Sequence, residues 1–265
     1  PASGIIDIGA LIVSGKDAAG FLHSQLTNEV NALKPGEGNL SARVTRTGTL
    51  VRYFSLHCTT GILRAGGDEP CFVLLLEREG IPSLSADLGK YALVEDVTLE
   101  DISEQYDWLT IQGAQAPLIA EGALGKIGDE SWSDLTEYSI RALPAGAFAV
   151  SRSLSGDTGF IIAIPRESGY TDEIFERLKQ SAQEKNALYL EGQDLIDLFE
   201  VLRIEAGIVR VGPDAAEGKL VLPETGMEQQ VVSYSKGCYL GQEVIARIRT
   251  YGSVPMVLRG VVFES

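Results

Sequence analysis

LIVSGKDAAGFL, residues 11–22, and LTIQGAQAPLIA, residues 109–120, share one pattern: an apolar strand, a glycine and then a helix. A second pair, FVLLLERE at 72–79 and FIIAIPRE at 160–167, precedes a helix in both cases. The two pairs are offset by 98 and 88 residues, which are nearly equal separations. Two copies of one β-rich unit would explain both pairs. Chance similarity between short apolar strands is the alternative.

The elements around these segments indicate the fold class. Strand and helix signals do not alternate one for one, so the sequence predicts an α+β fold rather than a doubly wound parallel sheet. Helices are expected from Asp17 to Pro35, from Pro82 to about Tyr91, from Thr171 through Ala182, and from Gln193 to Ala206. Strands are expected at 10–14, 39–45, 49–58, 71–76, 97–101, 107–112, 146–154, 159–164 and 187–191.

Composition excludes several classes of protein. The longest apolar runs, 72–76 and 160–164, are far shorter than the ~20 residues of a membrane span, so no membrane association is predicted. A net charge of −15 disfavours direct nucleic-acid binding. Three cysteines without metal-ligand spacing argue against a disulfide framework and for a reducing, cytoplasmic location. With only two histidines, no metal site is predicted.

The segment KGCYLGQEVIARIRTYG, residues 236–252, places glycines and polar residues around a single cysteine. Gly237 permits a tight turn, and apolar spacing predicts a helix from near Tyr239. Cys238 would then lie at a helix N-terminus, two residues after Lys236, and both features would lower the pKa of its thiol. The alternative is a cysteine buried as a small hydrophobe.

Polar side chains follow the cysteine on the same predicted helix. Glu243 and Arg247 are four residues apart and can pair on one helix face, with Gln242 beside them. Gly241 lets the backbone approach a ligand or a neighbouring strand closely. Between residues 236 and 259 there are four basic residues and one acid, so an anionic ligand is expected near this segment. A solvated basic strip is the alternative.

RIEAG, residues 203–207, ends the predicted helix 193–206. Glu205 lies off the apolar stripe of that helix, close to its C-terminus, where a carboxylate opposes the helix dipole. A heterocycle with an amino-amide edge could donate two hydrogen bonds to it. Pairing of Glu205 with Arg203 or with solvent is the alternative that spacing alone favours.

RIEAGIVRVG at 203–212 and KGCYLGQEVIARIRTYG at 236–252 together resemble the signature of YgfZ-type proteins in the YgfZ/GcvT folate-binding family. FLHSQLTNEV, residues 21–30, resembles the family's Phe-Leu-x-x-Gln-x-Thr-Asn helix, with Gln25, Thr27 and Asn28 at the matching positions. The resemblance covers most of the chain and is weakest between about residues 60 and 190.

The resemblance implies a folate-binding domain over residues 1–258, built from two related α+β halves that exchange strands, with a boundary near 95–105. It also implies a pocket for tetrahydrofolate or a derivative, in which Glu205 grips the pterin ring. The family's motif places functional residues at Lys236, Gly237, Cys238, Gly241, Gln242, Glu243 and Arg247, of which Gln242, Glu243 and Arg247 are expected to contribute to the folate site.

Cys238 matches the cysteine of the YgfZ branch, which the aminomethyltransferase branch lacks in this segment. The resemblance therefore implies an accessory protein for iron–sulfur cluster assembly or repair, and so for client enzymes such as those that modify tRNA. The expected partners are a folate and iron–sulfur client or assembly proteins. Cys238 would act as a functional thiol.

Two other functions stay open. The chain could be a folate-dependent aminomethyl or methyl transferase, with Asp96 or Asp101 facing N5 of the folate by chain position only. It could also be a protein-binding module that has lost its ligand.

The sequence departs from the family pattern in two places. Thr49 follows Gly48 where the family usually has an arginine, so a ligand contact from this turn is in doubt. Residues 259–265 resemble the start of the family's C-terminal β-barrel, which is expected to be truncated or absent.

Overall fold

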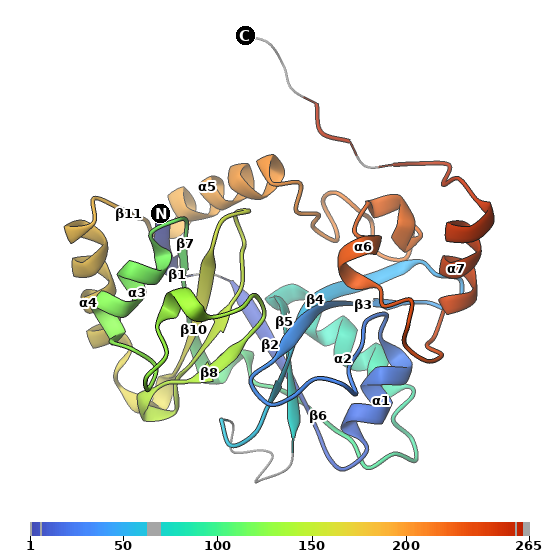
Figure 1. The fold of residues 1–265 in the computed structure, drawn as a ribbon, viewed down its shortest axis with the longest axis horizontal. Coiled ribbons are helices and arrows are strands. Elements are labelled where there is room, and N and C mark those ends of the chain that lie inside the picture. Colours follow the sequence, from blue (N-terminus) through green and yellow to red (C-terminus); the bar gives the residue numbers. More distant parts are fainter. Residues whose placement is uncertain (1, 6, 63–69, 258, 262–265) are drawn as a thin grey trace.

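The computed structural model describes residues 2–5, 7–62, 70–257 and 259–261, and it contains two sheets of six and five strands (Figure 1). The six-stranded sheet has the order β11-β1-β7-β10-β9-β8, and the five-stranded sheet has the order β3-β4-β5-β2-β6. The strands are β1 Ala2–Ile5, β2 Ile8–Ser14, β3 Gly38–Val44, β4 Leu50–Thr59, β5 Cys71–Glu77, β6 Thr98–Asp101, β7 Tyr106–Gln112, β8 Ile140–Ala142, β9 Phe148–Ser151, β10 Gly159–Pro165 and β11 Leu188–Tyr189.

Helices occupy the outer layers and the C-terminal part of the fold. The α-helices are α1 Ala18–Gln25, α2 Ile81–Gly89, α3 Ala116–Leu124, α4 Thr171–Glu184, α5 Gly192–Glu205, α6 Glu228–Val231 and α7 Gln242–Tyr251. Short 3₁₀ helices include η1 Arg78–Gly80, η2 Ser103–Gln105, η5 Arg166–Ser168 and η6 Leu222–Thr225. None of the helices in the described part of the chain combines the length and hydropathy that a membrane span requires.

The two halves exchange strands reciprocally. β1 leads directly into β2 but pairs with β7, and β6 leads into β7 but pairs with β2. The registers are equivalent, because Ile5 lies opposite Leu109 while Asp101 lies opposite Leu11. Leu11 and Leu109 are the first residues of the repeated sequence segments. The predicted α+β fold with two strand-exchanging halves is therefore confirmed.

Strand pleating explains why the apolar runs are continuous. Alternate residues of a strand point to opposite faces of its sheet. In β5, Phe72 and Leu74 pack with the helix layer of α1 and α2, whereas Val73 and Leu75 face the other sheet. Trp108 and Phe148 from the second sheet complete this inner layer. α3 and α4 cover the outer face of the second sheet, so both faces of the central strands are buried.

The chain after α5 returns to the first half of the molecule. Residues 209–245 supply Val209, Met227 and Ile245 to a core that they share with Val44 and Tyr53 of β3 and β4. Figure 1 shows α6 and α7 beside these strands, on the opposite side of the molecule from α3 and α4. The C-terminal signature is thus packed on the first sheet.

Two predictions about element bounds are wrong, and two short strands were not predicted. The helix expected to reach Pro35 ends at Gln25, because the chain then turns into extended backbone at Leu26 and pairs with β3. The helix expected from Tyr239 begins at Gln242. The short strands β1 and β8 were not predicted, since each has few residues and little apolar alternation.

His57 connects the halves through a fully buried imidazole. Its Nδ1 lies 2.8 Å from the carbonyl oxygen of Tyr138, and its Nε2 lies 2.9 Å from Oγ of Ser55. A carbonyl can only accept, so Nδ1 carries the proton and Nε2 accepts from the hydroxyl. Burial lowers the pKa of His57 to about 3. The ring is therefore neutral at physiological pH.

We expect this histidine to make the fold sensitive to acid. The unfolded chain binds a proton near pH 6.5, whereas the folded chain binds it only near pH 3, so stability is lost as pH falls through this window. Within this window, the titration of His57 lowers the free energy of unfolding by up to about 1.4 kcal/mol for each pH unit of acidification. Urea unfolding at pH 7, 6 and 5 should show a shallower pH dependence for His57→Gln than for wild type. Identical slopes would contradict the assignment.

Candidate functional site

A cavity of about 320 Å³ lies where the two halves meet α5. Residues from both halves form its wall, and α5 covers one side. The apolar part of the lining is Ile8, Tyr53, Leu76, Leu154, Leu195, Ile196, Phe199 and Ile208. The charged part is Asp7, Glu77, Glu79, Arg152, Glu200, Arg203 and Arg210. Apolar walls with a few polar groups are typical of small-molecule sites.

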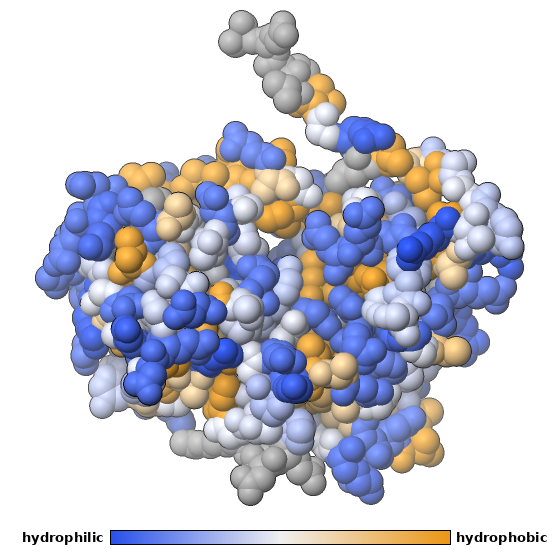
Figure 2. Space-filling view, viewed as in Figure 1, coloured by the Kyte–Doolittle hydropathy of each residue, from blue (hydrophilic) through white to orange (hydrophobic). Residues whose placement is uncertain are grey.

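α5 presents apolar residues in two directions. Leu195 is buried and Phe199 partly buried on the side that lines the cavity. Val201 and Ile204 are more than half exposed on the other side. Figure 2 shows hydrophobic residues gathered along the upper edge of the molecule, over the position of α5 in Figure 1. The helix therefore covers the cavity while its outer face stays open.

An ion-pair network fixes the C-terminal end of α5. Arg203 donates from Nη1 to Asp214 at 2.6 Å and from Nε to Glu200 at 2.8 Å. Arg210 also donates to Glu200, at 2.9 Å. Hydrogen bonds from Arg203 lower the pKa of Glu200, so its carboxylate stays ionised. This network holds the loop after α5 against the rim of the cavity.

Tyr53 provides a hydroxyl at the cavity wall. Its side chain is buried, and its hydroxyl donates to the carbonyl oxygen of Val209. Burial, and next the charge of Glu77, raise the pKa of this phenol, so it remains protonated. Tyr53 therefore ties β4 to the loop that follows α5.

Arg152 is the one buried arginine of the cavity wall whose Nε and Nη1 both lack acceptors among the described residues. Its side chain is 8% exposed. The backbone around it is fixed, because its N–H donates to Gly159 at 2.8 Å and its carbonyl accepts from Gln112 Nε2 at 3.1 Å. Arg210 has a buried Nε without an acceptor in the same part of the structure. Buried donors without acceptors among the described residues thus belong to side chains of the cavity wall.

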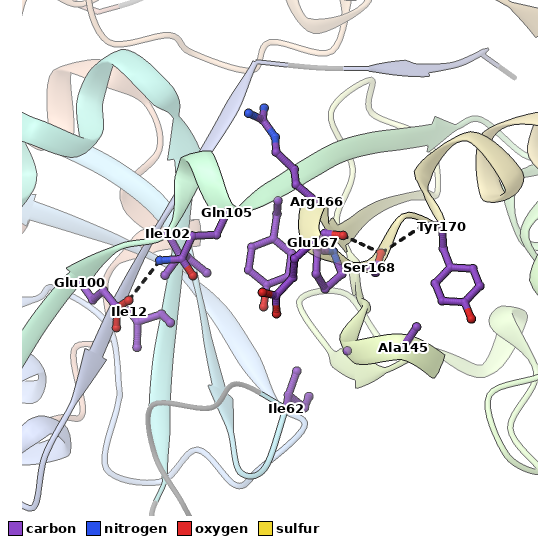
Figure 3. Close-up of a pocket in the computed structure, with 13 residues that line it drawn as sticks. Ile12, Ile62, Glu100, Ile102, Gln105, Ala145, Arg166, Glu167, Ser168 and Tyr170 are labelled. Carbon is purple, nitrogen blue, oxygen red and sulfur yellow. Dashed lines mark hydrogen bonds between the residues drawn. The ribbon is translucent and has the colours of Figure 1, made fainter.

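A second hollow, of about 950 Å³, lies between β6, η2 and η5 (Figure 3). Its charged groups are engaged by neighbours. Gln105 donates to Glu100 at 3.1 Å, and Arg166 donates to Asp107 at 2.9 Å. Figure 3 shows Arg166 pointing away from the other labelled residues. The predicted site residues line neither hollow, but Arg203 of the RIEAG motif lines the cavity beneath α5, so that cavity is the stronger candidate.

The structure brings two of the sequence motifs together through Lys236. Its ammonium is buried and donates to the carbonyl oxygens of His23, Leu26 and Asn28, each at 2.7 Å. Burial lowers the pKa of Lys236 to about 8, so the group is still charged at pH 7. Lys236 therefore caps the end of α1 across more than 200 residues of sequence.

Gln25, Thr27 and Asn28 have structural partners. Gln25 Oε1 accepts from Arg43 at 2.9 Å, and Thr27 Oγ1 donates to the carbonyl oxygen of Val231 at 2.5 Å. The Asn28 amide donates to the carbonyl oxygen of Leu40 at 2.8 Å. The motif predicted at 21–30 thus joins α1 and β3 to the C-terminal segment.

The surroundings of Cys238 differ from the expectation. Cys238 is exposed, three residues before Gly241, which is the N-cap of α7. The Lys236 ammonium is bonded to three carbonyls, so the two reasons given for a reactive thiolate do not hold. Gly237 is also exposed, and an added Cβ would meet only His23, at 3.7 Å.

Gly241 has a specific steric role. Its φ of +82° lies in the left-handed region, and an added Cβ would be 2.4 Å from the carbonyl oxygen of Thr45. This close approach docks α7 on the turn between β3 and β4. Gln242 is partly buried at the start of α7.

The remaining predicted residues do not form an open anion site. Glu243 and Arg247 make an outward ion pair of 2.7 Å between side chains that are 84% and 70% exposed. Arg249 stacks over the ring of Tyr234 at 3.7 Å. Three of the four basic residues of the expected strip are thus a buried lysine, a member of an ion pair and a stacked guanidinium. Thr49 is part of a turn, where its hydroxyl bonds that of Thr45.

Glu205 lies at the end of α5 with an exposed side chain and does not line the cavity. Its neighbours Arg203 and Ile208 do line it, but Glu205 follows Arg203 by two residues and so lies on another face of α5. The suggested pairing of Glu205 with Arg203 is not seen, since Arg203 bonds Glu200 and Asp214. Asp96 and Asp101 also lie outside the lining, and Asp101 accepts from Ser103.

Sequence reasoning missed the cavity residues Tyr53, Glu200 and Arg152. Only Arg203 of the RIEAG motif belongs to the cavity wall. Glu200 could have been found from its spacing of three residues before Arg203, which allows a helical ion pair. No local signal distinguishes Arg152 from an ordinary arginine after a strand.

Comparisons with known proteins agree on one family. The model of the GCVT N-terminal domain matches residues 2–233. A putative chloroplastic transferase of Arabidopsis thaliana is 27% identical, with 96% of this chain and 54% of that protein covered. An aminomethyltransferase of Caldanaerobacter subterraneus is 26% identical, with coverages of 95% and 64%. A tRNA-modifying protein YgfZ of Colwellia psychrerythraea is 25% identical, with coverages of 93% and 66%.

A solved structure has the same fold. Aminomethyltransferase T of the Bartonella henselae glycine cleavage system superposes with a TM-score of 0.76 at 18% identity, covering 95% of this chain and 63% of that one. The chain therefore spans between about half and two thirds of the length of these relatives.

We expect Lys236→Met to destabilise the fold by about 2–4 kcal/mol, because it leaves three carbonyl oxygens without their donor. Chemical unfolding measures this loss, and Lys219→Met, at an exposed lysine, is the matched control with little expected effect. Limited proteolysis should cut the segment after α5 sooner in Lys236→Met. Equal stability of the two variants would show that Lys236 is not a structural clamp.

Proposed function

The chain belongs to the GCVT N-terminal domain family of folate-binding, aminomethyltransferase-like proteins, and we propose that it binds tetrahydrofolate or a derivative in the cavity beneath α5. The observation that carries this proposal is the cavity itself, at the junction of the two halves. Its volume of about 320 Å³ suits the ring portion of such a ligand, with the tail extending through the opening.

The residues that line the cavity fit a flat, polar heterocycle. Phe199, Leu154 and Ile8 offer apolar surface to the ring faces. Arg152 adds a buried guanidinium to the wall, and its Nε and Nη1 have no acceptor among the described residues. Tyr53 remains protonated and keeps its bond to Val209, so it shapes the wall.

Glu205 is proposed to hold the amino-amide edge of the pterin at the cavity rim. Its position as the last residue of α5, just before the loop that carries Ile208 of the cavity wall, supports this role. Its exposed carboxylate is free to accept two hydrogen bonds from a ligand. The network of Arg203, Glu200 and Asp214 would fix the backbone that carries it.

Cys238 is proposed to act in a separate place, as the thiol of an accessory protein for iron–sulfur cluster assembly or repair. It is the exposed cysteine of the chain, since Cys58 and Cys71 are buried in β4 and β5. It does not line the folate cavity, so the folate and the thiol would serve different steps. Relatives named tRNA-modifying protein YgfZ support this direction, and iron–sulfur client or assembly proteins would be the partners. One cysteine cannot supply the four ligands of a cluster alone.

A folate-dependent aminomethyl or methyl transferase is the second candidate, because other relatives are named aminomethyltransferase. This reaction needs a group near N5 of the folate. The charged lining offers Glu77 and Asp7, whereas Asp96 and Asp101 lie elsewhere. A turnover assay with an aminomethyl or methyl donor separates the candidates, since an accessory protein would show no turnover with folate bound.

Calorimetric titration with 5-formyltetrahydrofolate tests folate binding. We expect wild type to bind and Glu205→Ala to bind about 2–4 kcal/mol more weakly, the scale of a lost charged hydrogen-bond pair. Glu176→Ala, an exposed glutamate on α4, should bind like wild type. Absence of binding by wild type would overturn the proposed ligand, and equal affinity of Glu205→Ala would overturn only the role of Glu205.

Replacement of the thiol tests the accessory role. Cys238→Ser should fold and bind folate like wild type, because the side chain is exposed and outside the cavity. It should fail to restore an iron–sulfur tRNA-modifying enzyme in cells that lack this protein. Ser235→Ala, at a nearby exposed residue, is the control and should restore it. Full restoration by Cys238→Ser would exclude a role for the thiol.

A further inference from the structure

Arg152 combines burial with unused hydrogen-bonding capacity. Its side chain is 92% buried, as its exposure is 8%. Nε and Nη1 have no acceptor in the part of the chain that the structure describes, although buried polar atoms nearly always have one. The residue lines the cavity beneath α5. An acceptor atom of a molecule bound in the cavity would give the Arg152 guanidinium the hydrogen-bond partner that it lacks.

Two carboxylates of the cavity wall have arginine partners other than Arg152. Glu200 accepts from Arg203 and Arg210, and Asp7 accepts from Arg78. The charge of Arg152 also acts on Glu137, whose carboxylate accepts from the N–H of Ser153 at 2.9 Å. None of these carboxylates accepts from Nε or Nη1 of Arg152.

The backbone that carries Arg152 is held rigidly. Gln112 is buried, and its Nε2 donates to the carbonyl of Arg152 while its Oε1 accepts from the N–H of Leu154 at 2.8 Å. An added Cβ at Gly159 would be 2.0 Å from this amide, so the strand is tightly packed on it. Gln112 thus fixes the loop that directs both Arg152 and Leu154 to the cavity.

We propose that Arg152 is a ligand-binding residue that recognises an oxygen acceptor, a carbonyl or a carboxylate, of the molecule in this cavity. The inference rests on the proposed function for the identity of that molecule. A reduced folate offers two such acceptors: the carbonyl of the pterin ring and the carboxylates of its glutamate tail. Arg152 donates to one of them from its guanidinium, whose Nε and Nη1 have no acceptor among the described residues. Gln112 is a positioning residue for this contact.

The test compares Arg152→Met with wild type by calorimetry. The ligands are 5-formyltetrahydrofolate and 6-methyltetrahydropterin, which has the ring carbonyl but no glutamate tail. Arg152→Met should raise the Kd for the folate about 10- to 100-fold, the range of a lost charge-assisted hydrogen bond. Arg177→Met, an exposed arginine on α4, is the matched control and should leave the Kd unchanged.

A ligand-free measurement separates binding from a structural role. Removing an unpaired buried charge should leave the melting temperature of Arg152→Met equal to or above that of wild type. A lower melting temperature, with no change in Kd, would show that Arg152 supports the fold instead.

The two ligands identify the acceptor. Weaker binding of both ligands by Arg152→Met supports contact with the ring carbonyl, and weaker binding of the folate alone supports contact with the tail. Unchanged affinity for both ligands, with wild type binding normally, overturns this inference alone. Absence of folate binding by wild type overturns the proposed function and this inference with it.

Discussion

The reciprocal pairing of β1 with β7 and of β6 with β2 is the constraint on which this structure depends. Each exchanged strand adds a row of backbone hydrogen bonds to the sheet of the opposite half. Their inner faces meet in one core that contains residues of both halves, such as Val73 and Trp108. The cavity lies at the same junction, with Ile8 of β2 and Arg152 after β9 in its wall. A ligand there would contact both copies of the duplicated unit.

The C-terminal signature depends on a different interaction, the buried ammonium of Lys236 against three carbonyls at the end of α1. In this contact the motif near residue 25 supplies the carbonyl acceptors, and the motif near residue 240 supplies the ammonium donor. Cys238 is exposed two residues after Lys236, whereas the cavity lies under α5. The structure thus separates the exposed thiol from the candidate ligand site.

The sequence was informative where physical causes are local. The run at 72–76 predicts a strand because both of its faces are buried, and the repeat predicts the duplicated fold. The early end of α1 could not be predicted, since the lysine that caps it is 210 residues away from Leu26. Arg152 was missed for a related reason: its lack of partners is a property of three-dimensional packing. Glu205 was chosen by resemblance, and its neighbour Arg203 proved to be the cavity residue.

The strand exchange also has a consequence for the order of biosynthesis. β1 is made before both of its partners, since β7 is complete only when Gln112 has been made and β11 ends at Tyr189. At typical translation rates the first interval lasts roughly 5–20 seconds. During that time β2 to β5 are made, while neither strand that pairs with β1 is complete. The nascent β1 is therefore open to chaperones or to pairing with another chain.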